Sequence, residues 1–236
     1  MTYIVSVLIY LVALVVFLFI AITTIICTYL FKPVQYDKFV KFLCRLLLRC
    51  MLIRVTTCGI ENFNHKKAYI FMSNHVNILD VFILNGYIPS FARGIEQEQH
   101  FSWFLWGKVI TRFGNIPIHQ KKLKRALASL TLAEEALSKG ISIIILPEGH
   151  RTRTGEMLPF MRGPFLLAQK TKADIVPLAI AGAFEIKKTG HWLIKPGTVK
   201  LIFGEVITHQ ETKHLPSKEL KELVRDKIQH LLQTSN

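Results

Sequence analysis

A histidine and an aspartate five residues apart are the first candidates for chemistry in this sequence. His75 and Asp80 lie in residues 73–80, SNHVNILD, directly after the apolar run Ala68–Met72. In an unbroken helix two such side chains point apart, because one turn takes about 3.6 residues. They can therefore meet only if His75 lies in a loop before the helix. A carboxylate on one imidazole nitrogen fixes the tautomer and leaves the other nitrogen as a base.

A second charged segment, LPEGHRTRTG at residues 146–155, follows another apolar run. The guanidinium of Arg151 is suited to bidentate binding of a phosphate, and Gly149 lets the backbone approach a ligand. Glu148 is the carboxylate of this segment. A charged turn is more often only a solvated loop, and the His75–Asp80 spacing alone also fits a capping histidine beside an unrelated aspartate.

Two further segments are weaker signals when taken alone. GNIPIHQKK begins at Gly114 and ends with Lys121 and Lys122, which could serve an anionic ligand or simply open a basic helix. IVPLA at residues 175–179 contains Val176 and Pro177 and reads as a strand interrupted by a proline.

Short apolar runs alternate with amphipathic stretches from residue 53 onward. The predicted strands are Ile53–Thr57, Ala68–Met72, Ser90–Gly94, Asn115–Ile118, Ile141–Leu146, Ile175–Ile180 and Val199–Phe203. The predicted helices are Ile78–Leu84, His100–Arg112, Gln120–Ser138 and a last one that Pro216 and Ser217 open. This alternation predicts an α/β fold with a mixed, largely parallel sheet flanked by helices. The charged segments lie at strand ends, where such sheets bind ligands.

The N-terminal segment is apolar enough to enter a membrane. The first 31 residues hold 26 apolar side chains and no Asp, Glu, Lys or Arg. As a helix, Tyr3–Phe31 would be about 43 Å long, against about 30 Å of bilayer hydrocarbon. That length leaves open whether it spans the bilayer or enters one leaflet. Positive charges follow the segment and none precedes it, which predicts a domain on the cytoplasmic side.

The next segment, Tyr36–Met51, predicts an amphipathic helix with a basic stripe. The stripe consists of Lys38, Lys41, Arg45 and Arg49. Such a helix suits the interface of an anionic membrane and would complete an N-terminal membrane-embedded helix pair. The alternative is an ordinary amphipathic helix packed on its own domain. We therefore divide the chain into a membrane part, residues 1–52, and an α/β domain, residues 53–236.

The order of the motifs is more specific than any one of them. H-x-x-x-x-D is followed by G-N-I-P-I, P-E-G-x-R and V-P-L, each beside the end of a predicted strand. From about Ala68 to Gly204 the sequence resembles the glycerolipid acyltransferase family. Members of that family transfer an acyl chain from a coenzyme A or carrier-protein thioester to a glycerolipid hydroxyl.

The resemblance assigns roles to residues of this sequence. It implies that His75 is the catalytic base and that Asp80 orients it. It also implies substrate binding by residues of the other motifs, namely Glu148, Gly149, Arg151, Gly114, Val176 and Pro177. No metal and no cofactor is implied, because the acyl thioester is a substrate.

Three departures from the family's usual motifs all touch recognition of the acceptor. His150 stands where threonine is usual, and Gln120 stands where the second motif usually ends in arginine. Residues 96–99 read EQEQ where lysine is common. Lys121 or Lys122 is then expected to take over the phosphate contact. The departures leave the transfer chemistry intact and the acceptor open.

The expected activity is membrane-bound O-acyl transfer to the sn-2 hydroxyl of lysophosphatidate, which gives phosphatidate. Another lysophospholipid or glycerol-3-phosphate is the alternative acceptor. A catalytically inert binder of lipid or nucleic acid would also fit the net charge of +14. The intact His75–Asp80 pair favours an enzyme, and the aromatics are not interleaved with cations as single-strand binding requires. The expected partners are the lipid bilayer, a lysophospholipid, and acyl-CoA or acyl-carrier protein.

Overall fold

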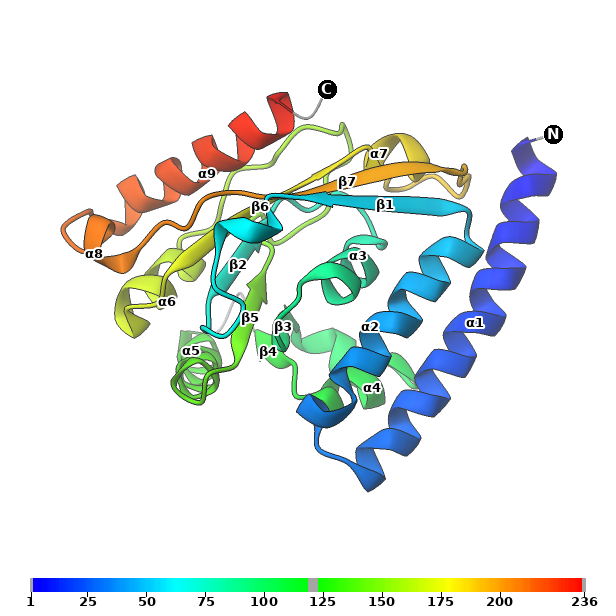
Figure 1. Cartoon of the computed structure of the whole chain (residues 1–236), viewed down its shortest axis with the longest axis horizontal. Coiled ribbons are helices and arrows are strands. Elements are labelled where there is room, and N and C mark those ends of the chain that lie inside the picture. Colours follow the sequence, from blue (N-terminus) through cyan, green and yellow to red (C-terminus); the bar gives the residue numbers. More distant parts are fainter. Residues whose placement is uncertain (1, 119–122, 235–236) are drawn as a thin grey trace.

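A seven-stranded sheet runs through the centre of the molecule, with helices on both faces (Figure 1). The computed structural model describes residues 2–118 and 123–234. The strand order is β1-β7-β6-β2-β5-β3-β4, and every neighbouring pair is parallel except β6 and β7. The strands are β1 (Ile53–Cys58), β2 (Ile70–Ser73), β3 (Ala92–Gln97), β4 (Ile116–Ile118), β5 (Ser142–Ile145), β6 (Ile175–Ala181) and β7 (Gly197–Phe203). The predicted mixed, largely parallel sheet is confirmed, and each of the seven predicted strands overlaps an observed one.

Two apolar clusters hold the helices against the sheet. Because strand side chains alternate in direction, Ile70 and Met72 of β2 join one cluster while Phe71 joins the other. The cluster around Phe71 packs α2 and α3, and the opposite one packs α5, α6 and α9. The helices are α1 (Thr2–Leu30), α2 (Pro33–Cys50), α3 (Asp80–Tyr87), α4 (Trp106–Phe113), α5 (Leu123–Ser138), α6 (Gly163–Thr171), α7 (Ala183–Ile186), α8 (His209–Thr212) and α9 (Ser217–Gln233).

The helix predicted over His100–Arg112 is wrong in its extent. The chain instead forms a 3-10 turn, η2 (Glu98–Ser102), and then α4, because Trp103 between them is extended. Gly107 allows this sharp return, since a Cβ there would lie 2.3 Å from the carbonyl oxygen of Phe101. The sequence also did not predict α6, α7 and α8, which are short.

Helix α1 is the one helix in the described ranges that is long and apolar enough to cross a membrane. It lies beside the rest of the protein along its whole length (Figure 1). Contacts occur near both ends and in the middle, between Ser6 and Ile194, Phe17 and Trp106, and Tyr29 and Arg112. Its outward face exposes large apolar side chains, such as Leu11, Val15 and Phe19.

Helix α2 packs on the domain and on α1, and this changes its predicted basic stripe. Lys41 is buried and pairs with Asp37, and Nε of Arg45 donates a hydrogen bond to the carbonyl oxygen of Gly86 at 2.6 Å. Only Lys38 and Arg49 of the predicted stripe are fully exposed. The prediction of one open basic face is therefore wrong, because Lys41 turns toward the loop after α3 and Arg45 toward α3 itself. The predicted boundary at residue 52 falls in the turn before β1, and the division of the chain into a membrane part and an α/β domain stays a prediction.

Candidate functional site

His75 lies in the loop between β2 and α3, and Asp80 is the first residue of α3. Nδ1 of His75 lies 2.7 Å from Oδ2 of Asp80, so the imidazole folds back onto the helix, which is the arrangement that a contact at this spacing requires. A carboxylate at Nδ1 fixes the proton on that nitrogen and leaves Nε2 as the basic one. Nε2 has no hydrogen-bond partner within the described ranges, and the His75 side chain is 17% exposed. The geometry therefore offers a free base at the surface.

Asp80 is fully buried and serves the loop as well as the histidine. Its Oδ2 also accepts hydrogen bonds from the amides of Val76 at 2.7 Å and Asn77 at 3.0 Å. Burial raises the pKa of Asp80, and the hydrogen bonds from His75, Val76 and Asn77 oppose that rise. The start of α3 also favours negative charge there through the helix dipole. One carboxylate thus fixes both the imidazole and the loop that carries it.

Glu148 connects the β5 loop to the His75 loop. One carboxylate oxygen accepts the backbone N–H of His75 and the other accepts the N–H of Leu158, both at 2.7 Å. The side chain is only 4% exposed, and burial raises the pKa of Glu148 while these amide bonds lower it. A further hydrogen bond joins the two loops, because the N–H of Thr152 donates to the carbonyl oxygen of His75 at 3.0 Å. These contacts fit a role of Glu148 in positioning His75 better than the predicted role in binding substrate.

Two asparagines that the sequence analysis missed hold the same loop from the other side. The Asn74 side chain bonds both the N–H and the carbonyl of Ile180 in β6, at 2.8 and 3.0 Å. Nδ2 of Asn77 donates to the carbonyl oxygens of Ala183 and Lys187, each at 2.8 Å. Both side chains are buried. The only signal in the sequence was their position on either side of His75, which does not reveal partners more than 100 residues away.

Three of the remaining predicted site residues, Arg151, Gly149 and Gly114, lie outside the strands of the sheet. Arg151 is exposed, and Gly149 takes a positive φ of 70° while its carbonyl accepts Nε2 of Gln97 at 3.3 Å. Gly114 ends α4 at φ 91°, where a Cβ would lie 2.9 Å from Nε of Arg93. The positive φ and the close approach of Arg93 explain why position 114 is a glycine.

Val176 and Pro177 lie inside β6 and are buried. They present little surface to a substrate, so a structural role fits them better than the predicted binding role. Lys121 and Lys122, and with them Gln120, lie outside the described residues. Glu96 is tied to Nε1 of Trp106 at 3.1 Å and Nδ2 of Asn115 at 2.8 Å, so its carboxylate stabilises α4 and the turn after it.

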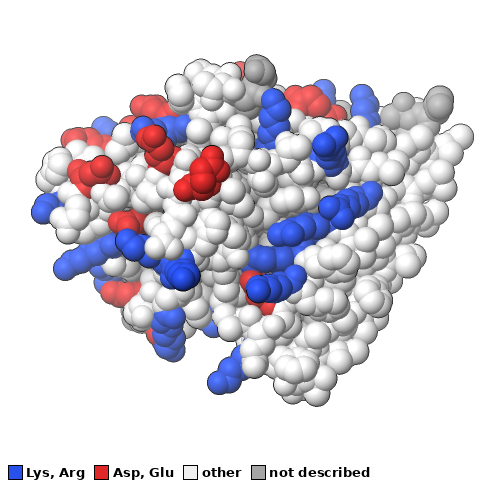
Figure 2. Space-filling view, in the orientation of Figure 1, with Lys and Arg blue, Asp and Glu red and all other residues white. Residues whose placement is uncertain are grey.

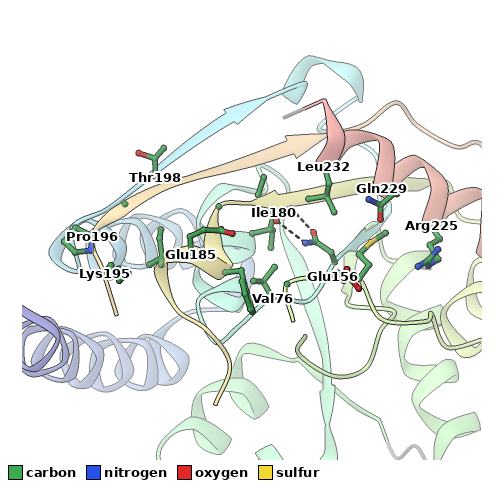
Figure 3. A pocket seen from close by; sticks show the side chains of 18 residues that line it. Val76, Glu156, Ile180, Glu185, Lys195, Pro196, Thr198, Arg225, Gln229 and Leu232 are labelled. Carbon is green, nitrogen blue, oxygen red and sulfur yellow. Dashed lines mark hydrogen bonds between the residues drawn. The ribbon is translucent and has the colours of Figure 1, made fainter. Parts of the chain in front are cut away.

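A cavity of about 1000 Å³ opens at the end of β6, between α7, α9 and the loop around Glu156 (Figure 3). Asn74 and Val76, the neighbours of His75, form part of its wall. His75, Asp80 and Arg151 do not line it, so the cavity is adjacent to the His–Asp pair rather than built around it. The described residues contain no cluster of three or more potential metal ligands.

Comparison with known proteins identifies the family. Residues 54–181, more than half of the chain, match the family model described as Acyltransferase. The chain belongs to the Acyltransferase family. The match covers β1 to β6 and includes the His75–Asp80 and Glu148–Arg151 segments.

Individual members of this family show how far the likeness extends. The chain is 27% identical to the 1-acyl-sn-glycerol-3-phosphate acyltransferase of Cocos nucifera, over 66% of this chain and 50% of that protein. It is 30% identical to the enzyme of that name from Pseudomonas aeruginosa, over 64% of this chain and 58% of that one. The chain thus spans about half the length of the first of these relatives.

The fold is shared with a solved structure. The crystal structure of the 1-acyl-sn-glycerophosphate (LPA) acyltransferase PlsC from Thermotoga maritima superposes with a TM-score of 0.84 at 21% identity. The superposition covers 99% of this chain and 95% of that one, so it includes α1 and α2 as well as the sheet.

Proposed function

We propose that this protein transfers a fatty acyl chain from an acyl thioester to the sn-2 hydroxyl of lysophosphatidate, giving phosphatidate. The observation that carries the proposal is the bond between Nδ1 of His75 and Asp80, which leaves Nε2 as the free ring nitrogen of a partly exposed side chain. The relatives named 1-acyl-sn-glycerol-3-phosphate acyltransferase support the choice of acceptor. Acyl-CoA or acyl-carrier protein serves as the donor, and no cofactor takes part.

The proposed reaction is a direct transfer without an acyl-enzyme. Nε2 of His75 accepts the proton of the acceptor hydroxyl while that oxygen attacks the thioester carbonyl. The buried carboxylate of Asp80 stabilises the imidazolium that forms. The tetrahedral intermediate collapses, the C–S bond breaks, and the thiolate takes the proton back from His75. A new ester and a free thiol result, and His75 returns to its neutral form.

The acceptor's phosphate is proposed to lie near Arg151. Its guanidinium is exposed, and the next residue, Thr152, is bonded to the His75 loop. A guanidinium can bind a phosphate through two parallel N–H groups. Lys121 and Lys122 remain proposed phosphate contacts from the sequence.

We further propose that α1 lies in one leaflet of the membrane. A helix crossing the bilayer would draw its packing partners into the hydrocarbon, and α1 is packed from Ser6 to Tyr29. Figure 2 shows an uncharged flank over α1, bordered by Lys and Arg side chains, as an interfacial element requires. The cations that follow α1 support a position of the domain on the cytoplasmic side. Labelling of the exposed Cys58 with an impermeant maleimide in sealed vesicles of known orientation tests this side.

A second acceptor class has one observation in its favour. Residues 96–99 carry no cation, and Gln97 there contacts the carbonyl of Gly149. A site with fewer cations than usual suits another lysophospholipid, and glycerol-3-phosphate is a further alternative.

An acyl-transfer assay on the detergent-solubilised protein tests the proposal. Lysophosphatidate, other lysophospholipids and glycerol-3-phosphate are offered in parallel, each with acyl-CoA and with acyl-carrier protein. We expect phosphatidate from lysophosphatidate as the fastest reaction. Faster turnover of another acceptor would overturn the acceptor assignment, and no turnover of any pair would favour the inert binder.

A further inference from the structure

The segment after α7 covers the loop that carries His75. Nδ2 of Asn77 donates to the carbonyl oxygens of Ala183 and Lys187, and Oγ1 of Thr189 donates to the carbonyl oxygen of Val76 at 3.0 Å. These bonds connect positions 106 to 113 residues apart in the chain. Residues 187–189 therefore sit at a fixed place beside the proposed base.

The ammonium group of Lys187 is held in place by its own segment. Nζ donates to the carbonyl oxygen of Lys188 at 3.1 Å and also to that of His191. An ammonium has three N–H donors, so two are used within the segment and one remains for a ligand. The residue is half-buried, whereas its neighbour Lys188 is exposed.

Arg151 belongs to a segment that is bonded to the same loop. Its neighbour Thr152 donates its N–H to the carbonyl oxygen of His75, so Arg151 is anchored one residue from the His75 loop. Both segments are bonded to the His75 loop, that of Lys187 at Asn77 and Val76 and that of Arg151 at His75. Burial and, to a smaller extent, the positive charge of Arg151 lower the pKa of Lys187. Among the residues that the structure describes, neither lies within 4.0 Å of a carboxylate. Two cations beside the same loop, neither of them paired with a carboxylate, favour an anion between them.

The other side of the His75–Asp80 pair supplies little positive charge. Residues 96–99 are two glutamates and two glutamines, and Gln97 approaches Gly149 with a neutral amide. A phosphate monoester carries a charge of about −1.5 to −2 at pH 7, more than one arginine neutralises. A second cation is needed, and Lys187 is already in place.

We propose that Lys187 binds the acceptor's phosphate together with Arg151 and so sets the preference for a phosphorylated acceptor. This rests on the proposed function, because the phosphate is that of lysophosphatidate. Lys187 contacts the phosphate and not the reacting carbonyl, so it acts on acceptor affinity and leaves the proton transfer to His75.

Steady-state kinetics of Lys187→Gln, with Lys188→Gln as the matched control, tests the proposal. We expect Lys187→Gln to raise the KM for lysophosphatidate at least tenfold, with kcat and the KM for the acyl donor each within about twofold. Lys188→Gln leaves all three values unchanged. An unchanged acceptor KM in Lys187→Gln, or an equal rise in the KM for the donor, would overturn the inference.

A second experiment needs no variant and no activity. The intact protein is treated briefly with acetic anhydride, with and without inorganic phosphate, and acetylation of each lysine is measured by mass spectrometry. Phosphate should slow the modification of Lys187 at least threefold and leave that of Lys188 unchanged. Equal rates at Lys187 with and without phosphate would contradict the site. Protection without turnover of lysophosphatidate would instead contradict the proposed function while the anion site stands.

Discussion

Replacing Glu148 by glutamine tests whether this residue positions the base, His75, or binds the acceptor. Both carboxylate oxygens accept backbone amides, those of His75 and Leu158, and the side chain is almost fully buried. Glutamine has nearly the same shape but only one acceptor oxygen, and its NH₂ group would face the second amide. At least one of the two bonds is therefore lost in Glu148→Gln, and the His75 loop loses part of its support.

The size of the effect follows from the bonds that are lost. A hydrogen bond to a charged group contributes about 1.5–3 kcal/mol. We take the lower end, because the raised pKa of Glu148 indicates that burying its charge offsets part of the gain. A loss of about 1.5 kcal/mol in the positioning of His75 corresponds to a kcat lowered roughly tenfold, since about 1.4 kcal/mol is one factor of ten.

Steady-state kinetics with varied acceptor measures this directly. We expect kcat of Glu148→Gln to fall about tenfold, with the acceptor KM within about twofold of the wild-type value. Glu156→Gln is the matched control, because Glu156 is exposed on the same loop and its change should leave kcat unaltered. A raised acceptor KM at unchanged kcat would refute the reasoning, since it would show that Glu148 contacts the substrate.

Two other predictions concern stability. Gly182→Ala should lower the free energy of unfolding by about 2 kcal/mol or more, because φ is +84° and a Cβ would lie 2.6 Å from the carbonyl oxygen of Thr198. Gly140→Ala should cost only about 1 kcal/mol in denaturant unfolding, since φ is +75° with nothing within 4 Å, and equal losses would contradict the steric argument. Burial raises the pKa of Glu148, so the folded state holds its proton more tightly than the unfolded chain does. The difference in the free energy of unfolding, wild type minus Glu148→Gln, should therefore decrease as the pH rises from about 4.3 through the raised pKa. An increase of this difference over that range would contradict the raised pKa of Glu148.

Local patterns predicted the scaffold of the site well. The run of branched aliphatic residues at 141–146 predicted β5, and the spacing of His75 and Asp80 indicated that the two can meet only with the histidine in the loop before the helix. Both inferences depend only on residues near each other in the chain. The periodicity of a strand and the rotation per residue of a helix are enough to make them.

The contacts that fix the His75 loop were not predictable in the same way. Glu148 is 73 residues from His75, and Asn77 is 106 residues from Ala183. Such bonds arise from how the sheet brings β2, β5 and β6 together, and no local pattern encodes them. The same limit explains α2, where Lys41 and Arg45 continue a basic stripe in sequence but turn toward the domain once α2 packs beside α3.

The comparison of His75→Ala with His214→Ala tests the central claim most directly. Both changes remove an imidazole, but His214 is exposed in the turn before α9. The measurement is kcat/KM for phosphatidate formation by the purified, detergent-solubilised variants. A positioned base contributes about 10²–10⁴ in rate, so His75→Ala should lose that factor while His214→Ala keeps the wild-type value. Wild-type activity in His75→Ala would contradict the assignment of His75 as the base.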